Sequence, residues 1–517
     1  MSLHARSLVE HVLGTPDYPV LQAYFDCRAR VSAIIGPLGS GKTVTTVQRL
    51  FWQAVEQKAN AKGIRPTRWL LIRNTTKDLL ETTQPDVMAV LGEMGSMHYG
   101  GRGEAPEFRL RIRLSDGTFV HADFIFVGLD HLGDVRKLRG YQVTGVWLNE
   151  AKELVKPIVD MADDRHGRYP SLIDGEVVCS WHGMMLDCNA PDEDHWLYKA
   201  AEEQTHLGPT GEVQKGPEGW AVFKQPGGVL RDETGEGVPD ELGHARWQIN
   251  PAAENARNLP GGAAGYYLSK VTSRRYDYVR VNYANEYAFT VDGLPVHPEY
   301  QDSVHCSSRI LRANPDCPLV LGIDFGRTPA AVFVQRHPAL GRWYVIDELT
   351  TENMSAAIFA PELKLYLDRN YPGFRVSGWG DPAGDRAGDT VETTPIEILR
   401  AAGIPCQPAQ SNVPALRRAA VAGPIRRNCM DGRPAFLISP AAKMTRKGLQ
   451  GGYCYRRIKT AQGERYTDEA DKNIYSHPVE ALEYALMGGG EGREALRRPE
   501  SRTGRPRQVL REVPRGR

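Results

Sequence analysis

The sequence has little that marks a secreted or membrane protein. Its eight cysteines are scattered from Cys27 to Cys454, with no CxxC pair and no paired Cys/His spacing. This distribution argues against a disulfide framework or a zinc site and is typical of a reducing cytosol. The stretch MSLHARSLVEHVLGTPDYP at the N-terminus lacks an apolar signal core, and no apolar run is long enough to span a bilayer. We therefore expect a cytoplasmic protein.

A strong charge of either sign is also missing. The chain carries 64 Lys and Arg against 63 Asp and Glu, a formal net charge of +1. Any surface for nucleic acid must therefore be local. What is present is a 517-residue chain with 41% hydrophobic and 25% charged residues. Such a chain is ordinary for a globular protein and long enough for two or three domains.

The strongest motif is a phosphate-binding loop. A predicted strand over residues 31–35 is followed by GPLGSGKT and then by a helical pattern, which is the context that such a loop requires. The glycines let backbone N–H groups converge on phosphate oxygens, Lys42 adds a cation, and the Thr43 hydroxyl can take a Mg²⁺ position. The expected nucleotide contacts are Gly36, Gly39, Ser40, Gly41, Lys42 and Thr43.

A phosphate-binding loop also needs a downstream strand that ends in an acidic residue. The run GVWLNE supplies such a strand, with Asn149 where aspartate is usual and Glu150 beside it. Asn149 can accept a hydrogen bond from metal-bound water, although it brings no charge. Glu150 is placed to polarise the attacking water, and we include it among the catalytic residues.

Three further places offer side chains to the nucleotide. Arg136 and Arg139 precede that strand, and either could neutralise the transferring phosphate or simply lie in a solvated basic stretch; we include Arg139 in the catalytic set and leave the choice open. Asn189, in DCNAP, could sense the γ-phosphate. In PVLQAYF, Gln22 could read the adenine edge and Tyr24 could stack on the base, although helix packing accounts for both on residue type alone.

The second half carries three acids on separate predicted elements. Asp324 lies in the apolar run LVLGID, Asp381 ends the strand of VSGWGD, and Glu480 lies on the helix of SHPVEALEYAL. Carboxylates suit a pair of Mg²⁺ or Mn²⁺ ions, which can clamp the attacking water and the leaving oxygen of a phosphodiester. Each acid alone also fits a cap, a turn or a surface charge, so the predicted metal site depends on the pattern. Whether Asp385, Asp471 or His477 joins it stays open.

The chain organisation is that of an α/β protein. Strands alternating with helices predict a mainly parallel sheet covered on both faces in the first part, and a second αβ pattern begins near Asp316. We expect a motor domain over 1–205, a lid or linker region over 206–312, rich in Gly, Pro and Glu, and a nuclease domain over 313–490. Residues 491–517 are rich in Arg and Pro without apolar periodicity, which predicts a disordered basic tail.

These motifs, in this order, resemble the large terminase subunit of tailed double-stranded DNA bacteriophages. The resemblance rests on GPLGSGKT, LRGYQVTGVWLNEA, NAPDEDHWLYK, ENARNLPGGAAGYYLSKV, VNYANEYAFTVDGLPVHPEY, GIDFG, GDPAGD and KNIYSHPVEALEYAL. The chain departs from the family pattern at Asn149 and at Glu480, where aspartate is commoner. The resemblance implies an N-terminal P-loop ATPase and a C-terminal nuclease with an RNase H-like, or RuvC-like, fold.

The resemblance also implies a function and partners. The implied function has two parts. One is ATP-driven movement of double-stranded DNA through the portal protein into a prohead, and the other is cleavage of concatemeric DNA, at a specific site or when the head is full. The implied cofactors are ATP with Mg²⁺, and two Mg²⁺ or Mn²⁺ ions for the nuclease. A small terminase subunit and a homo-oligomeric ring, a pentamer on the portal, are implied as further partners. The protein would lie in the host cytoplasm, docked transiently on the prohead and absent from the mature virion. The resemblance favours Gln22 and Tyr24 as adenine contacts and Asn189 as the coupling residue.

Two other functions share parts of this pattern. A helicase-nuclease of DNA repair uses both chemistries but separates strands, which a packaging motor does not need. A non-enzymatic packaging scaffold with a degenerate ATPase site is slightly favoured by Asn149, whereas the intact Gly41, Lys42, Thr43 and Glu150 argue against it.

Overall fold

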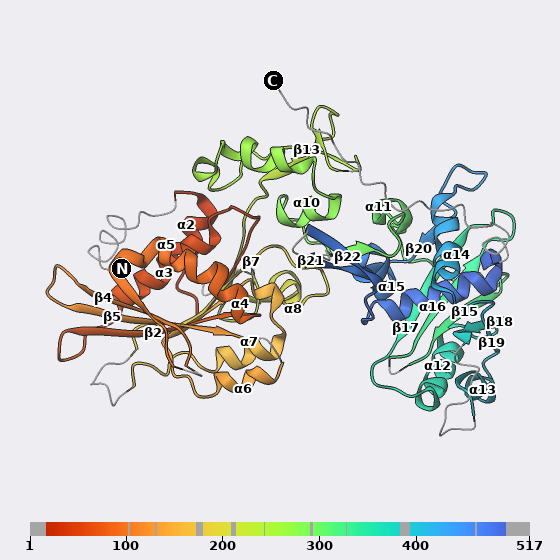
Figure 1. Ribbon diagram of the computed structural model, residues 1–517, viewed down its shortest axis with the longest axis horizontal. Helices are drawn as coiled ribbons and strands as arrows, with labels where there is room; N and C mark the ends of the chain where they lie inside the picture. The colour runs from red at the N-terminus through yellow and green to blue at the C-terminus, as the bar shows by residue number, and fades with distance from the viewer. Residues whose placement is uncertain are drawn as a thin grey trace. The chain divides into compact units, whose positions relative to one another are not determined.

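The computed structural model describes residues 17–101, 104–129, 132–171, 179–207, 213–241, 243–289, 293–326, 328–382, 393–460 and 463–492. By packing, the chain divides into two compact units, Met1–Phe289 and Thr290–Arg517, and each contains one large sheet (Figure 1). The finer boundaries expected at 205/206 and 312/313 stay predictions. No helix in the described part of the chain combines the length and apolarity needed to cross a membrane.

The first unit is built on an eight-stranded sheet in the order β10-β1-β7-β6-β2-β5-β4-β3. Neighbours from β10 to β5 are parallel, and β4 and β3 are added antiparallel at one edge. The strands are β1 (Val31–Ile35), β2 (Ile64–Arg73), β3 (Gly95–His98), β4 (Glu107–Arg113), β5 (Phe119–Gly128), β6 (Gly145–Asn149), β7 (Gly183–Cys188) and β10 (Trp220–Lys224). The predicted parallel sheet and the hairpin of β4 and β5 are confirmed.

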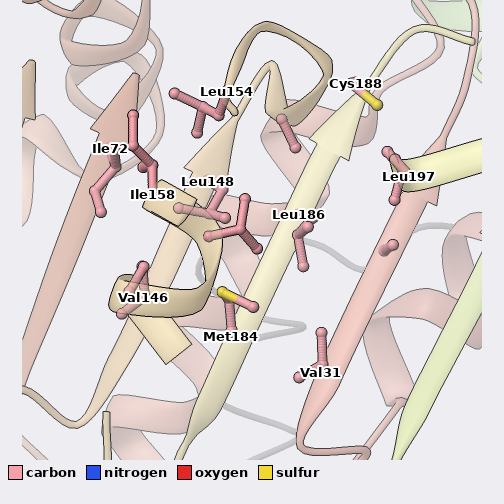
Figure 2. Packing of buried hydrophobic residues seen from close by; sticks show 14 of the residues in the cluster. Val31, Ile72, Val146, Leu148, Leu154, Ile158, Met184, Leu186, Cys188 and Leu197 are labelled. Carbon is pink, nitrogen blue, oxygen red and sulfur yellow. The ribbon is translucent and has the colours of Figure 1, made fainter. Parts of the chain in front are cut away.

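Helices cover both faces of this sheet, as Figure 1 shows for α3 and α5 on one side and α6 and α7 on the other. The helices are α2 (Pro19–Asp26), α3 (Lys42–Glu56), α4 (Thr76–Asp78), α5 (Gln84–Leu91), α6 (Val135–Leu138), α7 (Lys156–Asp163) and α8 (Trp196–Tyr198). Because side chains alternate along a strand, Val146 and Leu148 of β6 pack with Ile158 of α7 (Figure 2). Trp147, between them, belongs to the opposite core with Leu50 of α3.

The region after β7, most of which falls in the lid or linker region expected over 206–312, contributes to the first unit as far as Phe289. Its strand β10 joins the main sheet parallel to β1, with Val31 opposite Trp220. A small apolar cluster around Trp247 and Tyr267 holds the remainder together. The elements there are β8 (Thr205–Leu207), β9 (Val213–Lys215), β11 (Val229–Arg231), β12 (Val238–Pro239), β13 (Arg246–Ile249), α9 (Ser269–Val271) and α10 (Tyr276–Asn282).

The second unit is built on a six-stranded mixed sheet in the order β19-β18-β15-β16-β17-β20. β15, β16 and β17 form an antiparallel meander, and β18 and β19 follow on the other side of β15 in parallel. This order and direction are those of the predicted RNase H-like sheet. The strands are β15 (Leu319–Asp324), β16 (Ala330–Arg336), β17 (Trp343–Thr350), β18 (Val376–Gly380), β19 (Cys406–Pro408) and β20 (Phe436–Ile438).

Helix α16 (Ser476–Leu486) lies unusually close to strand β15. A Cβ atom placed on Gly322 of β15 would lie 1.8 Å from the carbonyl oxygen of Ala481 in α16, so only glycine permits this approach. The other elements of the unit are β14 (Gly293–Pro295), α11 (Asp302–His305), α12 (Ala356–Asn370), α13 (Pro395–Ala401), α14 (Pro414–Arg426), α15 (Lys443–Lys447), β21 (Cys454–Thr460), β22 (Gly463–Ala470) and α16 (Ser476–Leu486).

The disordered tail was expected to begin at Glu491, but this residue is part of the folded second unit. Glu491 is buried and accepts hydrogen bonds from Trp343 Nε1 at 2.8 Å and from Arg427 Nη1 at 2.9 Å. It therefore belongs to the folded second unit, and a basic tail can start no earlier than the residues after it. Residues 493–517 and Asp385 lie outside the described residues.

Candidate functional site

The predicted phosphate-binding loop lies between β1 and α3. Gly39 and Gly41 have φ values of 75° and 84°, in the left-handed region that L side chains rarely adopt. A Cβ atom on Gly36 would lie 1.9 Å from Gln225 Oε1. The glycines of the motif are therefore required by backbone conformation and close packing, and Gly41 is the N-cap residue of the helix that begins at Lys42.

Lys42 is a buried cation that forms no salt bridge with a carboxylate in the described part of the chain. Its side chain is 5% exposed, and its hydrogen bonds within the described residues go to the carbonyl oxygen of Pro37 at 3.2 Å and to Asn189 Oδ1 at 2.9 Å. Both acceptors are uncharged. A buried ammonium group with neutral partners at a helix N-terminus fits an anionic phosphate group.

Polar side chains from two neighbouring strands meet behind the loop. Asn149 of β6 is directly opposite Asp187 of β7 in the sheet register. Alternation along the strands places both on the same face as α3, where Thr43 Oγ1 donates to Asp187 Oδ2 at 3.0 Å. Asn149 Nδ2 donates to Asp187 Oδ1 at 3.1 Å. Burial and the nearby Glu150 raise the pKa of Asp187, against the opposing effects of Lys42 and of its hydrogen-bond donors.

The amide of Asn149 is held in one orientation by its neighbours. Its oxygen accepts from Thr83 Oγ1 at 2.7 Å and from Arg73 Nη1 at 3.3 Å, while its nitrogen faces Asp187. The reverse orientation would place the amide oxygen against a carboxylate and its NH₂ group against a guanidinium. The hydrogen bonds of the Asn149 oxygen thus go to Thr83 and Arg73, and its expected role toward metal-bound water stays a prediction.

Glu150 occupies a strained backbone position at the end of β6. Its φ and ψ are 51° and 52°, and a non-glycine residue there costs of the order of 1 kcal/mol or more. Such strain concentrates at functional sites. The half-buried Glu150 lies one residue beyond the Asn149–Asp187 pair.

Residues between β10 and the end of the first unit hold the loop in place. Gln225 bonds Ser40, with its Oε1 2.8 Å from Ser40 Oγ, and Asn255 Nδ2 donates to the carbonyl oxygen of Gly39 at 2.8 Å. Asn189 Nδ2 donates to Asn282 Oδ1 at 3.0 Å. The backbone oxygen of Asn282 in turn accepts from Leu38 N–H at 2.8 Å. Sequence analysis assigned none of this region to the nucleotide site, because scattered amides in a Gly-rich stretch carry no pattern.

The side chains predicted to contact adenine or to act as an arginine finger differ in their exposure. Tyr24 is fully buried, and its hydroxyl group pairs with Thr46 while its ring lies under the Arg49 guanidinium. The prediction that Tyr24 stacks on adenine is therefore wrong, because its ring packs in the core. Gln22 is partly exposed and donates to Asp26, so its role stays a prediction. Arg136 and Arg139 are both exposed on and just after α6, which does not decide between them.

In the second unit, two of the predicted acids lie side by side. β15 and β18 are parallel with Ile323 opposite Gly380, so Asp324 and Asp381 follow at neighbouring strand ends, and Asp381 N–H donates to the carbonyl oxygen of Ile323. Asp324 is buried, and His477 Nδ1 lies 2.8 Å from its Oδ2. Burial raises the pKa of Asp324 to about 6, and the charge of Glu480 acts in the same direction.

Glu480 faces this pair from α16, but it already has cationic partners. Lys472 pairs with both of its carboxylate oxygens, Arg417 Nη2 lies 3.4 Å from Oε1, and Tyr453 OH donates to Oε1 at 2.7 Å. Burial alone would raise the pKa of Glu480, but Lys472, Arg417 and Tyr453 together lower it.

No three His, Cys, Asp or Glu side chains among the described residues stand close enough to hold one metal ion as placed. The donor chemistry of Asp324, Asp381 and Glu480 still fits hard divalent ions. Of the supporting groups left open, His477 contacts Asp324, whereas Asp471 pairs with Arg456 at 2.6 Å.

Three further functional residues were not predicted from the sequence: Asp187, Lys472 and Arg417. Asp187 carries a readable signal, since it is an acid near the end of β7 and lies two residues before Asn189. Lys472 and Arg417 carry none, because their contacts with Glu480 come from separate elements of the fold.

No protein-family model matches the chain, and no curated protein matches it either. Among solved structures, the chain is similar to the large terminase of a thermophilic bacteriophage, with 11% identity, coverage of 90% of this chain and 96% of that one, and a TM-score of 0.36. It is similar to the HK97 bacteriophage large terminase, with 10% identity, 93% and 98% coverage and a TM-score of 0.39. The nuclease domain of the P22 large terminase matches 38% of this chain and 93% of its own, with 10% identity and a TM-score of 0.28. At these identities and TM-scores the similarity gives no role to any residue and no activity to the chain. The argument for function therefore depends on the geometry of the two sites.

Proposed function

We propose that the chain is a viral DNA-packaging motor that hydrolyses ATP in its first unit and cleaves DNA in its second. One observation carries the proposal: a phosphate-binding loop with a buried, directly unneutralised Lys42 shares a chain with an RNase H-like sheet that brings Asp324 and Asp381 together. The first feature fits ATP, and the second fits phosphodiester cleavage. Double-stranded DNA, a portal protein, a small terminase subunit and a pentameric ring of copies are the partners that the proposal includes.

In the nucleotide site, the loop amides and Lys42 would hold the phosphates, and the Thr43 hydroxyl would help to hold the Mg²⁺ that accompanies ATP and neutralises its charge. Lys42 then exchanges a neutral partner for the γ-phosphate. Because Asn189 contacts both Lys42 and Asn282, loss of the γ-phosphate changes the hydrogen bonds that reach α10. Glu150 orients and deprotonates the attacking water.

In the cleavage site, Asp324, Asp381 and Glu480 would hold the divalent ions. Two such ions supply an activated water and stabilise the leaving oxygen. His477 orients the Asp324 carboxylate, and Tyr453 and Arg417 orient Glu480. Lys472 must leave the Glu480 carboxylate before an ion can bind there.

The test is whether two substitutions in the purified chain each remove one of the two activities and leave the other intact. Lys42→Ala should abolish ATP turnover and leave Mn²⁺-dependent plasmid cleavage intact, while Asp381→Ala should do the reverse. Loss of both activities in either variant, with folding verified by circular dichroism, would contradict a two-site enzyme. Cleavage at the unchanged rate by Asp381→Ala would remove that residue from the site.

A further inference from the structure

The nucleotide site contains a carboxylate that the standard pattern does not place there. Asp187 is the penultimate residue of β7, 1% exposed, and accepts from Thr43 Oγ1 at 3.0 Å. Thr43 is the hydroxyl residue that a phosphate-binding loop offers to Mg²⁺. The position that normally carries the partner acid, at the end of the neighbouring strand, is held by Asn149, directly opposite Asp187 in the register.

The charges around Asp187 leave a place for a cation. Among the described residues, the side chains that donate to it are neutral: Trp147 Nε1 at 2.9 Å, Asn149 Nδ2 at 3.1 Å and Thr43 Oγ1. The hydrogen bonds of Lys42 go instead to Pro37 and Asn189. A buried carboxylate is costly without a cation or a full set of donors, and a divalent ion beside Thr43 would supply the missing positive charge.

Asn149 is arranged to support that carboxylate. Its amide oxygen is held by Thr83 and Arg73, which turns its NH₂ group toward Asp187. Trp147, two residues earlier on the same face of β6, donates to the same Oδ1 atom. Both donate to Oδ1, while Oδ2 accepts from Thr43 Oγ1 at 3.0 Å and lies 3.3 Å from Asn149 Nδ2.

We infer that acid and amide have exchanged places between β6 and β7, so that Asp187 is the residue that positions Thr43 and the hydration shell of Mg²⁺ in the nucleotide complex. Asn149 positions Asp187. This inference rests on the proposed nucleotide binding and names the residue on which the Mg²⁺ dependence of that binding relies.

The experiment measures binding of a fluorescent ADP analogue by the full chain, with and without Mg²⁺, so that it does not depend on turnover. Asp187→Asn should leave Mg²⁺-free binding within a few-fold of the unchanged chain. Its Mg²⁺ requirement should rise by about 10- to 100-fold, the usual effect of losing a residue that orients metal ligands. Asp240→Asn is the matched control, because it removes another buried carboxylate of the same unit, one that accepts from the backbone N–H groups of His244 and Ala245.

The decisive variant exchanges the two side chains. Asn149→Asp with Asp187→Asn keeps one acid and one amide in contact and should recover the Mg²⁺ requirement of the unchanged chain to within a few-fold. Asn149→Asp alone places two carboxylates at the 3.1 Å contact and should not strengthen Mg²⁺ binding. Normal Mg²⁺ dependence in Asp187→Asn, or failure of the exchange variant to bind with Mg²⁺ dependence, would overturn the assignment. If the unchanged chain binds no nucleotide at all, the proposed ATPase itself is wrong.

Discussion

At the scale of single residues, Glu150 is the group on which ATP turnover should depend most. It follows Asn149 directly in a left-handed backbone conformation, and β6 itself (Gly145–Asn149) carries no acid that could replace it. Glu150→Gln should lower ATP turnover by about 10²-fold or more, the scale of losing a positioned general base. Nucleotide binding should persist. Steady-state ATPase measurements with a parallel binding titration check this, and normal turnover would mean that the catalytic base lies elsewhere.

Asp324 should make stability depend on pH. Its pKa is raised to about 6 by burial, from an ordinary value of 3.8. The folded state therefore binds the proton more tightly than the unfolded state, and the free energy of unfolding falls as pH rises from about 4 to about 6. Asp324→Asn has no such titration, so it should be the more stable chain at pH 8, by at most about 3 kcal/mol.

That gain should shrink as the pH falls toward 4, because Asp324 is then protonated in the folded state and no longer carries a buried charge. Urea unfolding of both chains at pH 8, 6 and 4.5, in buffers with a chelator, measures it. A constant difference across this range would show that Asp324 titrates normally in the folded protein.

Lys472 should compete with metal ions for Glu480. Its side chain is mostly exposed, yet its ammonium group pairs with both Glu480 oxygens. Lys472→Met should therefore lower the Mn²⁺ concentration that gives half-maximal plasmid cleavage. Lys364→Met is the matched control, since Lys364 pairs with the exposed Asp368 on α12. A higher Mn²⁺ requirement in Lys472→Met would instead make the lysine part of the working site.

At the scale of elements, the approach of α16 to β15 positions the cleavage site. Gly322→Ala would place its Cβ atom 1.8 Å from the Ala481 carbonyl oxygen, so the helix must move and carry Glu480 with it. We expect loss of cleavage and a lower melting temperature for the second unit, with ATP turnover retained. Gly423→Ala is the control, because its nearest neighbours would lie 3.7 Å away or more. Full cleavage by Gly322→Ala would separate the site from this packing.

Some residues of the two sites could be predicted from the sequence, and others could not. The loop from Gly36 to Thr43 and the acids Asp324 and Asp381 were predictable, because a local pattern and the ends of predicted strands define them. The partnership of Asn149 with Asp187 was not, because it depends on which strands are neighbours and in what register. The supporting amides of Gln225 and Asn255 were hidden for a related reason, since their contacts with the loop span 185 and 216 residues of chain.

At the scale of the whole molecule, a basic tail after the folded second unit should serve docking or DNA retention. Because Glu491 is part of that unit, the informative truncation ends at Gly492 and not at Gly490. The chain ending at Gly492 should keep ATPase and cleavage activity and package DNA poorly. Normal packaging would reduce the tail to a solubilising segment, and loss of ATPase activity would place it in the motor.

The central claim is that ATP hydrolysis at the phosphate-binding loop moves double-stranded DNA. The most direct measurement is protection of pre-cut linear DNA from added DNase after incubation with proheads of the same virus, ATP and the purified chain. The unchanged chain and Asp381→Ala should both protect the DNA, since linear DNA needs no initial cut, and Lys42→Ala should protect none. Protection by Lys42→Ala, or ATP-dependent strand separation without protection by the unchanged chain, would contradict the proposed packaging motor.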